Sequence, residues 1–182
     1  TIQKRESALG LVSTQEIEEM FLRTQKQLLA RIQVSLAGLV AEEIWYGQTT
    51  SGPSSDLVNA TRNAAAYVGV YGMGRSLISA AASGPGPYGE VDPIGVVLSD
   101  GDRRREVDAI LNDCRDNVRN LLLKKRHVVE GVRDALLERE ELVGDEIEVL
   151  MAELGEREPI EVPSTPQGDG LAFEPGGNGQ GG

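Results

Sequence analysis

The chain has 182 residues, of which 40% are hydrophobic, 26% charged and 4% aromatic, a composition that predicts one domain of ordinary size. Its formal net charge of −11 argues against nucleic acid as a partner, because phosphate binding needs a clustered basic face. No run approaches the roughly 18–20 consecutive apolar residues that span a bilayer, and the first residues carry no secretory signal.

Two residue types limit the sites that the chain can build by itself. Cys114 is the single cysteine, which excludes an internal disulfide and a multi-cysteine zinc site and fits a reducing compartment. His127 is the single histidine, which rules out most self-contained catalytic sites. Because the chain begins at Thr1 without a methionine, we expect it to be a piece of a longer protein.

The N-terminal part predicts a short strand and a long helix. Residues 8–12 form a brief apolar run that predicts the strand. Ser13 and Glu16 have the spacing of a helix capping box. Apolar residues then recur at steps of three and four up to about Trp45, and Gly47 is a natural helix stop.

The middle of the chain alternates between turn-forming and helical sequence. Residues 48–56 are polar and contain Gly and Pro, which predicts a loop. Residues 57–71 predict a slim helix, rich in alanine, that packs closely against neighbours on more than one side. Gly72 and Gly74 should end it, and residues 79–101 predict a long loop.

The C-terminal part predicts one long helix over residues 102–139, a short helix over 146–154 and a tail. Apolar residues of the long helix repeat every 3.5 residues on average, which predicts a straight seam against a partner helix. The seam comprises Val107, Leu111, Cys114, Val118, Leu121, Lys125, Val128, Val132 and Ala135. Residues 155–182 are rich in Gly and Pro and predict a disordered tail. The fold class is therefore mainly α, a helical bundle over residues 1–154 with a short N-terminal edge strand.

Several polar residues invite functional interpretation, and each has an ordinary structural alternative. Asp56 follows a Gly-Pro loop at a helix start, where a carboxylate serves as a helix cap or, held rigidly, as a metal ligand. Glu42 and Glu43 are either solvated charges or, for the one that faces inward, the support of a metal-bound histidine. Their side chains point about 100° apart on a helix. We expect His127 to be solvated and Cys114 to be a small core residue.

An ordered series of motifs resembles the peptidase domain of FtsH-type proteases. Residues 36–47 (Leu-Ala-Gly-Leu-Val-Ala-Glu-Glu-Ile-Trp-Tyr-Gly) are similar to the family's Gly-Gly-Arg-Ala-Ala-Glu-Glu segment. Residues 49–57 (Thr-Thr-Ser-Gly-Pro-Ser-Ser-Asp-Leu) resemble its Thr-Thr-Gly-Ala-x-Asn-Asp-Leu loop. Further matches, in order, are Ala-Thr-Arg at 60–62, Tyr-Gly-Met-Gly at 71–74, Glu-Val-Asp-Ala-Ile-Leu at 106–111, and residues 136–147.

The resemblance implies an ATP-dependent zinc metalloendopeptidase that degrades unfolded or membrane proteins as a homo-hexamer. Asp56 would be the third zinc ligand, beside two histidines of a His-Glu-x-x-His helix, and ATP and Mg would bind a separate ATPase domain. A strand at the substrate groove would comprise Ala8, Leu9, Gly10, Leu11 and Val12. The peptidase would face the cytoplasm, and membrane anchoring of the longer protein stays open.

The sequence also departs from the family pattern. No His-Glu-x-x-His occurs, so the segment alone should be inactive, and truncation explains the absence because the family motif precedes the matched segment. Leu39 and Val40 replace the family's Arg-Ala, and Ser55 replaces the Asn before Asp56. These changes leave an alternative function, a non-catalytic peptidase-like domain for oligomerisation and docking.

Overall fold

The computed structural model describes residues 1–3, 12, 22–83 and 92–156. These residues form helices, turns and loops, and none of them is in a strand, so the mainly α fold class is confirmed. Of the predicted edge strand, only Val12 is described; it has no regular secondary structure and its exposed fraction is 89%. No helix within the described ranges combines the length and apolar composition needed to cross a membrane.

The first helix, α1 (Gln25–Tyr46), has a clear start and stop signal at its two ends. Thr24 caps it: the Gln27 backbone N–H donates to Thr24 Oγ1 (3.3 Å), and the Thr24 N–H donates back to Gln27 Oε1 (2.8 Å). Gly47, in the left-handed region at φ 67°, ends the helix as predicted. The prediction of one unbroken helix from Ser13 was wrong, because residues 22–24 are not helical; the predicted cap at 13–16 lies outside the described residues.

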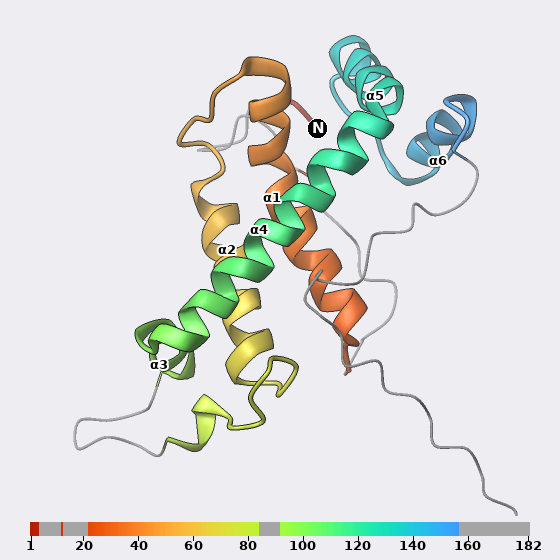
Figure 1. The fold of residues 1–182 in the computed structure, drawn as a ribbon. Coiled ribbons are helices and arrows are strands. Elements are labelled where there is room, and N and C mark those ends of the chain that lie inside the picture. The colour runs from red at the N-terminus through yellow and green to blue at the C-terminus, as the bar shows by residue number, and fades with distance from the viewer. Residues whose placement is uncertain (4–11, 13–21, 84–91, 157–182) are drawn as a thin grey trace, which may run out of the picture.

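Helices α1, α2 (Ser54–Gly69) and α4 (Gly101–Lys124) form the core, and α4 crosses the other two in Figure 1. Three alanines of α2 are fully buried, which lets both neighbouring helices approach, as the slim-helix prediction required. The first half of the predicted seam on α4 is buried in this core. The buried side chains of this core include Leu28, Leu29, Ile32, Leu36, Ala60, Ala64, Ala65, Val68, Val107 and Cys114.

The predicted loop over residues 79–101 is interrupted by helical structure, which corrects that prediction. A single 3₁₀ turn, η1, spans Ala80–Ala82, and α3 spans Pro93–Ser99. The Asp92 side chain accepts the Ile94 N–H (3.1 Å) and Pro93 occupies the first turn of α3, where its missing N–H costs nothing. Val97 of α3 is fully buried against α2 at Gly69.

The long helix predicted over residues 102–139 is divided at Lys125, where α4 ends and α5 (Arg126–Arg139) begins. Here the Val128 N–H donates to the carbonyl of Lys125, three residues earlier (2.9 Å), which makes a tighter turn than an α-helix has. The chain changes direction at this turn, as Figure 1 shows. The break falls at the one polar position of the predicted seam. Leu154, the residue that follows α6 (Gly144–Glu153), is seated against Gly131 of α5.

Both described ends of the chain lie near this second helix pair. The Ile2 N–H donates to the carbonyl of Glu140 (2.9 Å), the residue that caps α5 at φ 64°. Glu156, after α6, receives a salt bridge from Lys125 Nζ (2.5 Å). Residues 157–182, which make up nearly all of the predicted tail, lie outside the described residues.

Candidate functional site

The loop that joins α1 to α2 brings the candidate metal ligand into place. Gly47 ends α1, and a turn closed by the Ser54 N–H and the Ser51 carbonyl (3.3 Å) leads into α2. Pro53 is buried and occupies the cap position, where it offers no side-chain acceptor. Asp56 therefore lies in the first turn of α2 and does not cap it.

The Asp56 carboxylate is exposed at the positive end of the α2 dipole. Its side chain makes no hydrogen bond or ion pair with the residues that the structure describes, although the helix fixes its backbone. The interpretation of Asp56 as a helix cap is wrong, because its carboxylate accepts no hydrogen bond from the free N–H groups at the start of α2. An unengaged carboxylate on a rigid element is chemically suited to bind a cation.

Glu42 reaches from α1 to this loop. One of its carboxylate oxygens accepts the Thr50 backbone N–H (2.7 Å), and the other accepts the Thr50 hydroxyl (2.9 Å). The Thr50 Oγ1 in turn accepts the Gly52 N–H (3.1 Å). A continuous chain of hydrogen bonds thus ties the loop to α1 only a few residues before Asp56.

Glu43 points to a different neighbour. Its side chain, 15% exposed, forms ion pairs with the guanidinium groups of Arg115 and Arg119 on α4. The two adjacent glutamates diverge as helical geometry requires, one toward the loop and one toward the core helix. Glu43 therefore holds α1 against α4.

The other candidates lie apart from the loop. His127 is exposed on the first turn of α5, as expected, and the guanidinium of its neighbour Arg126 stacks 5.4 Å from the centroid of the Trp45 ring. Cys114 is buried in the core, where loss of solvation raises the pKa of its thiol to about 11. Of the predicted groove strand, residues 8–11 lie outside the described residues.

Metal-binding side chains do not converge within the part of the chain that the structure describes. Among those residues, no group of three or more His, Cys, Asp or Glu side chains is placed to hold a metal ion. Asp56 can supply one carboxylate ligand, and a zinc site built on it requires further ligands from outside the described residues.

Sequence reasoning missed two residues that support this region. Thr50 donates its N–H and its hydroxyl to Glu42, and its Oγ1 accepts the Gly52 N–H, which links Glu42 to the loop. Glu106 of α4 accepts the Arg75 N–H (2.8 Å) and so fixes the turn after α2, in which Gly74 approaches the Val68 carbonyl too closely for a side chain. Both residues fall in segments that resemble the family motifs, so the motif match was the available signal.

Comparison with known proteins gives a consistent set of relatives. Residues 1–150 match the profile of peptidase family M41. The ATP-dependent zinc metalloprotease FtsH of Chloroflexus aggregans is 37% identical over 148 residues, which cover 74% of this chain and 22% of the relative. The protein of the same name from Syntrophobacter fumaroxidans is 32% identical over 173 residues, covering 86% and 26%. ATP-dependent zinc metalloprotease FTSH 11 of Arabidopsis thaliana is 31% identical, covering 93% and 20%.

These relatives are much longer than the chain. It spans about a quarter of the length of the curated proteins that it matches.

Proposed function

Because this chain belongs to peptidase family M41, we propose that it is the C-terminal part of the peptidase domain of an ATP-dependent zinc metalloendopeptidase. The observation that carries the proposal is the state of Asp56, an exposed carboxylate without a described partner, on a helix whose leading loop is tied to α1. A carboxylate engaged in a cap or an ion pair would be a poor candidate for a ligand.

Asp56 would supply the third protein ligand to zinc, beside two histidines of a His-Glu-x-x-His helix outside this chain. Bound zinc would act as a Lewis acid toward a peptide carbonyl and activate a water molecule. Glu42 would act as a positioning residue, because it fixes the loop before Asp56 through Thr50. Glu43 would contribute only to the packing of α1 on α4.

The substrates would be unfolded or membrane proteins that bind as extended chains. Residues 8–12 would align them by main-chain pairing at the groove. The active protein would be a homo-hexamer, with ATP and Mg bound by an ATPase domain outside this chain and the peptidase facing the cytoplasm. By itself, the 182-residue chain would be inactive.

The test is the Asp56→Asn substitution in the longer protein that contains this chain, assayed by ATP-dependent hydrolysis of casein. Asparagine has nearly the same volume but lacks the charge, so we expect hydrolysis to fall by more than the roughly 10–100-fold that loss of a group supporting a metal ligand costs. Asp102→Asn is the matched control, since Asp102 is an exposed aspartate in the first turn of α4. Unchanged hydrolysis in Asp56→Asn would refute the ligand role.

A non-catalytic docking domain is the competing function. It is favoured by Leu39 and Val40, which replace the family's Arg-Ala, and by the predicted seam of α4, where Val107, Cys114 and Val118 are buried. If the longer protein forms oligomers but neither retains zinc nor hydrolyses casein, the docking function replaces the protease function.

A further inference from the structure

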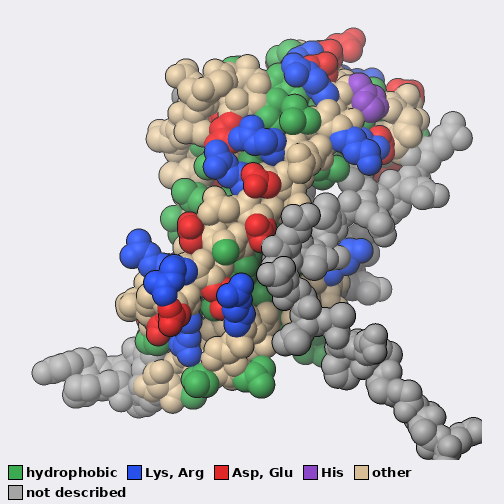
Figure 2. Space-filling model, in the orientation of Figure 1, with side chains coloured by type: hydrophobic (Ala, Val, Ile, Leu, Met, Phe, Trp, Pro, Cys, Tyr) green, Lys and Arg blue, Asp and Glu red, His purple; other side chains and the backbone are tan. Residues whose placement is uncertain are grey.

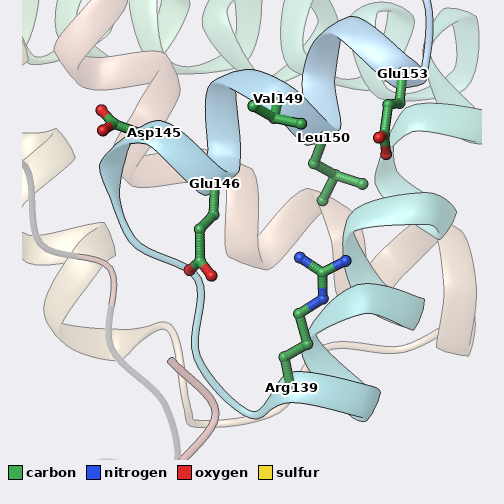
Figure 3. Close-up of a pocket in the computed structure, with 6 residues that line it drawn as sticks. All are labelled: Arg139, Asp145, Glu146, Val149, Leu150 and Glu153. Carbon is green, nitrogen blue, oxygen red and sulfur yellow. The ribbon is translucent and has the colours of Figure 1, made fainter.

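Helices α5 and α6 stand apart from the main hydrophobic core. Among the described residues, that core reaches no further along the chain than Cys114, so it includes nothing from either helix. Figure 1 shows both helices beyond the end of α4, away from α2 and α3. In Figure 3, Arg139 of α5 extends toward Leu150 of α6. The contacts that fix these two helices to the rest of the molecule therefore lie outside the core.

Two contacts join α5 and α6 to each other. A Cβ at Gly131 of α5 would lie 2.6 Å from Leu154 Cδ2, so the residue that follows α6 sits directly on α5. Lys125 Nζ, at the start of α5, forms a salt bridge with Glu156 Oε1 (2.5 Å), and both side chains are partly buried. We call residues 125–156, which these contacts join, the α5–α6 unit.

Trp45 joins this unit to the end of α1. The Arg126 guanidinium lies 5.4 Å from the centroid of the Trp45 ring, within the range of a cation–π interaction. The pKa of the Glu130 carboxyl is lowered, chiefly because Arg126 Nε donates to it (2.8 Å), with a smaller effect of the Trp45 side chain. Figure 2 shows Lys, Arg, Asp and Glu side chains exposed together at this end of the molecule, and Arg126 is 54% exposed. The contact can therefore be altered without opening the core.

The Trp45 contact lies beside the loop that leads to Asp56. Trp45 is in the last turn of α1, two residues before the Gly47 that ends the helix. Glu42, about one turn earlier, accepts two hydrogen bonds from Thr50 in the loop. The end of α1 is therefore tied both to the loop and to α5.

The other end of α5 holds the first residues of the chain. The Glu140 carbonyl accepts the Ile2 N–H (2.9 Å) and the Thr1 hydroxyl (3.3 Å). Its carboxylate accepts a third hydrogen bond, from Gln3 Nε2 (3.1 Å). Among the residues that the structure describes, Glu140 is also the one residue other than glycine with a positive φ, 64°. Such a conformation persists where the surrounding structure fixes it, so the end of α5 is a defined attachment point.

Residues 1–3 connect two parts of the proposed site. In one direction the chain leads to the proposed His-Glu-x-x-His helix outside this chain, and in the other to residues 8–12, the proposed groove strand. Asp56, the proposed third ligand, belongs to a different segment. A site divided in this way needs both segments at a fixed separation, because a misplacement of about 1 Å can lower activity about 100-fold.

We infer that the α5–α6 unit fixes these two segments relative to each other. Arg126 on Trp45 holds the end of α1, and Glu140, about 20 Å away along α5, holds residues 1–3. Trp45 and Glu140 are then positioning residues for the proposed zinc site. This inference rests on the proposed function and adds to it two residues that are not themselves ligands.

A distance measurement in the 182-residue chain tests the Trp45 contact. Spin labels at Ser55→Cys and Glu148→Cys, on exposed positions of α2 and α6, report how firmly the unit is held to the Asp56 segment. The native Cys114 is buried and its thiol pKa is raised to about 11, so it reacts little with the label at neutral pH. We expect a narrow distribution of distances, which Arg126→Gln broadens and Arg126→Lys, which keeps the cation, leaves narrow.

The control for this measurement is Arg105→Gln, which removes an exposed ion pair with Asp102 on α4 and should leave the distribution narrow. A distribution that is equally narrow in Arg126→Gln would show that the contact with Trp45 does not hold the unit. A broad distribution in the chain without either arginine variant would equally overturn the inference.

Zinc binding by the longer protein tests what the unit does for the proposed site. Ile2→Pro removes the N–H that Glu140 accepts, and Ile2→Val keeps it. In competition with a chelator, we expect Ile2→Pro and Arg126→Gln each to bind zinc about 10-fold more weakly, as loss of a group that supports a metal ligand does. Ile2→Val and Arg126→Lys should bind it normally. Glu43→Ala, which removes the ion pairs between α1 and α4, should lower stability without weakening zinc binding.

The outcomes separate this inference from the proposed function. If the unmodified longer protein binds no zinc, or if Asp56→Asn binds it equally well, the proposed function fails and the inference falls with it. If zinc binding depends on Asp56 but is normal in Ile2→Pro and Arg126→Gln, the protease function stands and the positioning role of the α5–α6 unit is overturned.

Discussion

Residues Glu42 and Glu43 are neighbours in sequence but serve separate parts of the molecule. Helical geometry turns their side chains about 100° apart, so Glu42 meets Thr50 in the loop and Glu43 meets two arginines of α4. That divergence was predictable from sequence. The partners were not, since Thr50 is eight positions away and Arg115 is 72 positions away, and only the tertiary fold brings them together.

Replacing Glu42 should therefore lower activity, whereas replacing Glu43 should lower stability. In Glu42→Ala the loop before Asp56 loses its anchor, so we expect casein hydrolysis by the longer protein to fall about 10–100-fold. In Glu43→Ala two guanidinium groups lose their partner, so urea unfolding of the chain should show a loss of about 1–3 kcal/mol. Thr50→Val serves as a second variant for the loop, because it removes one of the two hydrogen bonds to Glu42. If Glu42→Ala hydrolyses casein at the normal rate, Glu42 does not position the ligand.

At the scale of elements, glycines mark where helices approach one another. A Cβ at Gly69 would overlap the Val97 side chain of α3, whereas a Cβ at Gly38 of α1 would meet nothing within 4 Å. Gly69→Ala should therefore destabilise the chain by about 1–3 kcal/mol through overpacking. Gly38→Ala should stabilise it by about 0.4–1 kcal/mol, because alanine favours the helix. Thermal unfolding of the two variants should give shifts of opposite sign, and shifts of the same sign would contradict this packing.

The start of α4 depends on a charged cap. The pKa of the Asp100 carboxyl is lowered from its ordinary value of 3.8, chiefly because the Arg103 N–H donates to it, with a second bond from the Asp102 N–H. A carboxyl whose pKa is lower in the folded state stabilises the fold above its unfolded pKa, and this contribution is lost as the pH falls through the folded value.

Asp100→Ala should therefore lower the melting temperature at pH 7 by about 2–4 °C. The difference from the unmodified chain should narrow as the pH is lowered below 4, because the native carboxyl then becomes protonated. Asp100→Asn, which keeps an acceptor oxygen, should recover part of the loss at pH 7. A difference that stays constant with pH would show that the charge of Asp100 does not contribute.

Element boundaries were predictable where a local signal exists. The end of α1 at Gly47 and the position of α6 follow from a left-handed glycine and a change of periodicity. Helix α3 was missed because it has only seven residues and contains Gly95, although Asp92-Pro93 is a helix-start signal. The break at Lys125 falls where neither Gly nor Pro marks it, so the sequence pattern could not place it.

At the scale of the whole molecule, the chain holds one part of the proposed site. Asp56 is its single proposed zinc ligand. The described residues place no group of histidine, cysteine or acidic side chains around it that could hold a metal ion. Sequence could predict this ligand only through the ordered motif resemblance, because an aspartate at a helix start is most often structural. The exposed state of the carboxylate became evident only from the fold.

This distribution predicts that the 182-residue chain folds but does not hydrolyse casein, even with added zinc. Its core is packed from apolar side chains, so helical circular dichroism should be unaffected by a chelator. Chelator-sensitive hydrolysis by the chain alone would contradict this prediction, because the chain would then hold a full set of zinc ligands.

The zinc content of the longer protein shows most directly whether Asp56 is a zinc ligand. Elemental analysis of purified, extensively dialysed protein should find about one zinc per chain in the unmodified form and in the Asp102→Asn control. In Asp56→Asn the retained zinc should fall to a small fraction of that amount. Equal zinc content in Asp56→Asn and the unmodified protein would contradict the assignment and leave Asp56 as an exposed helix-start aspartate.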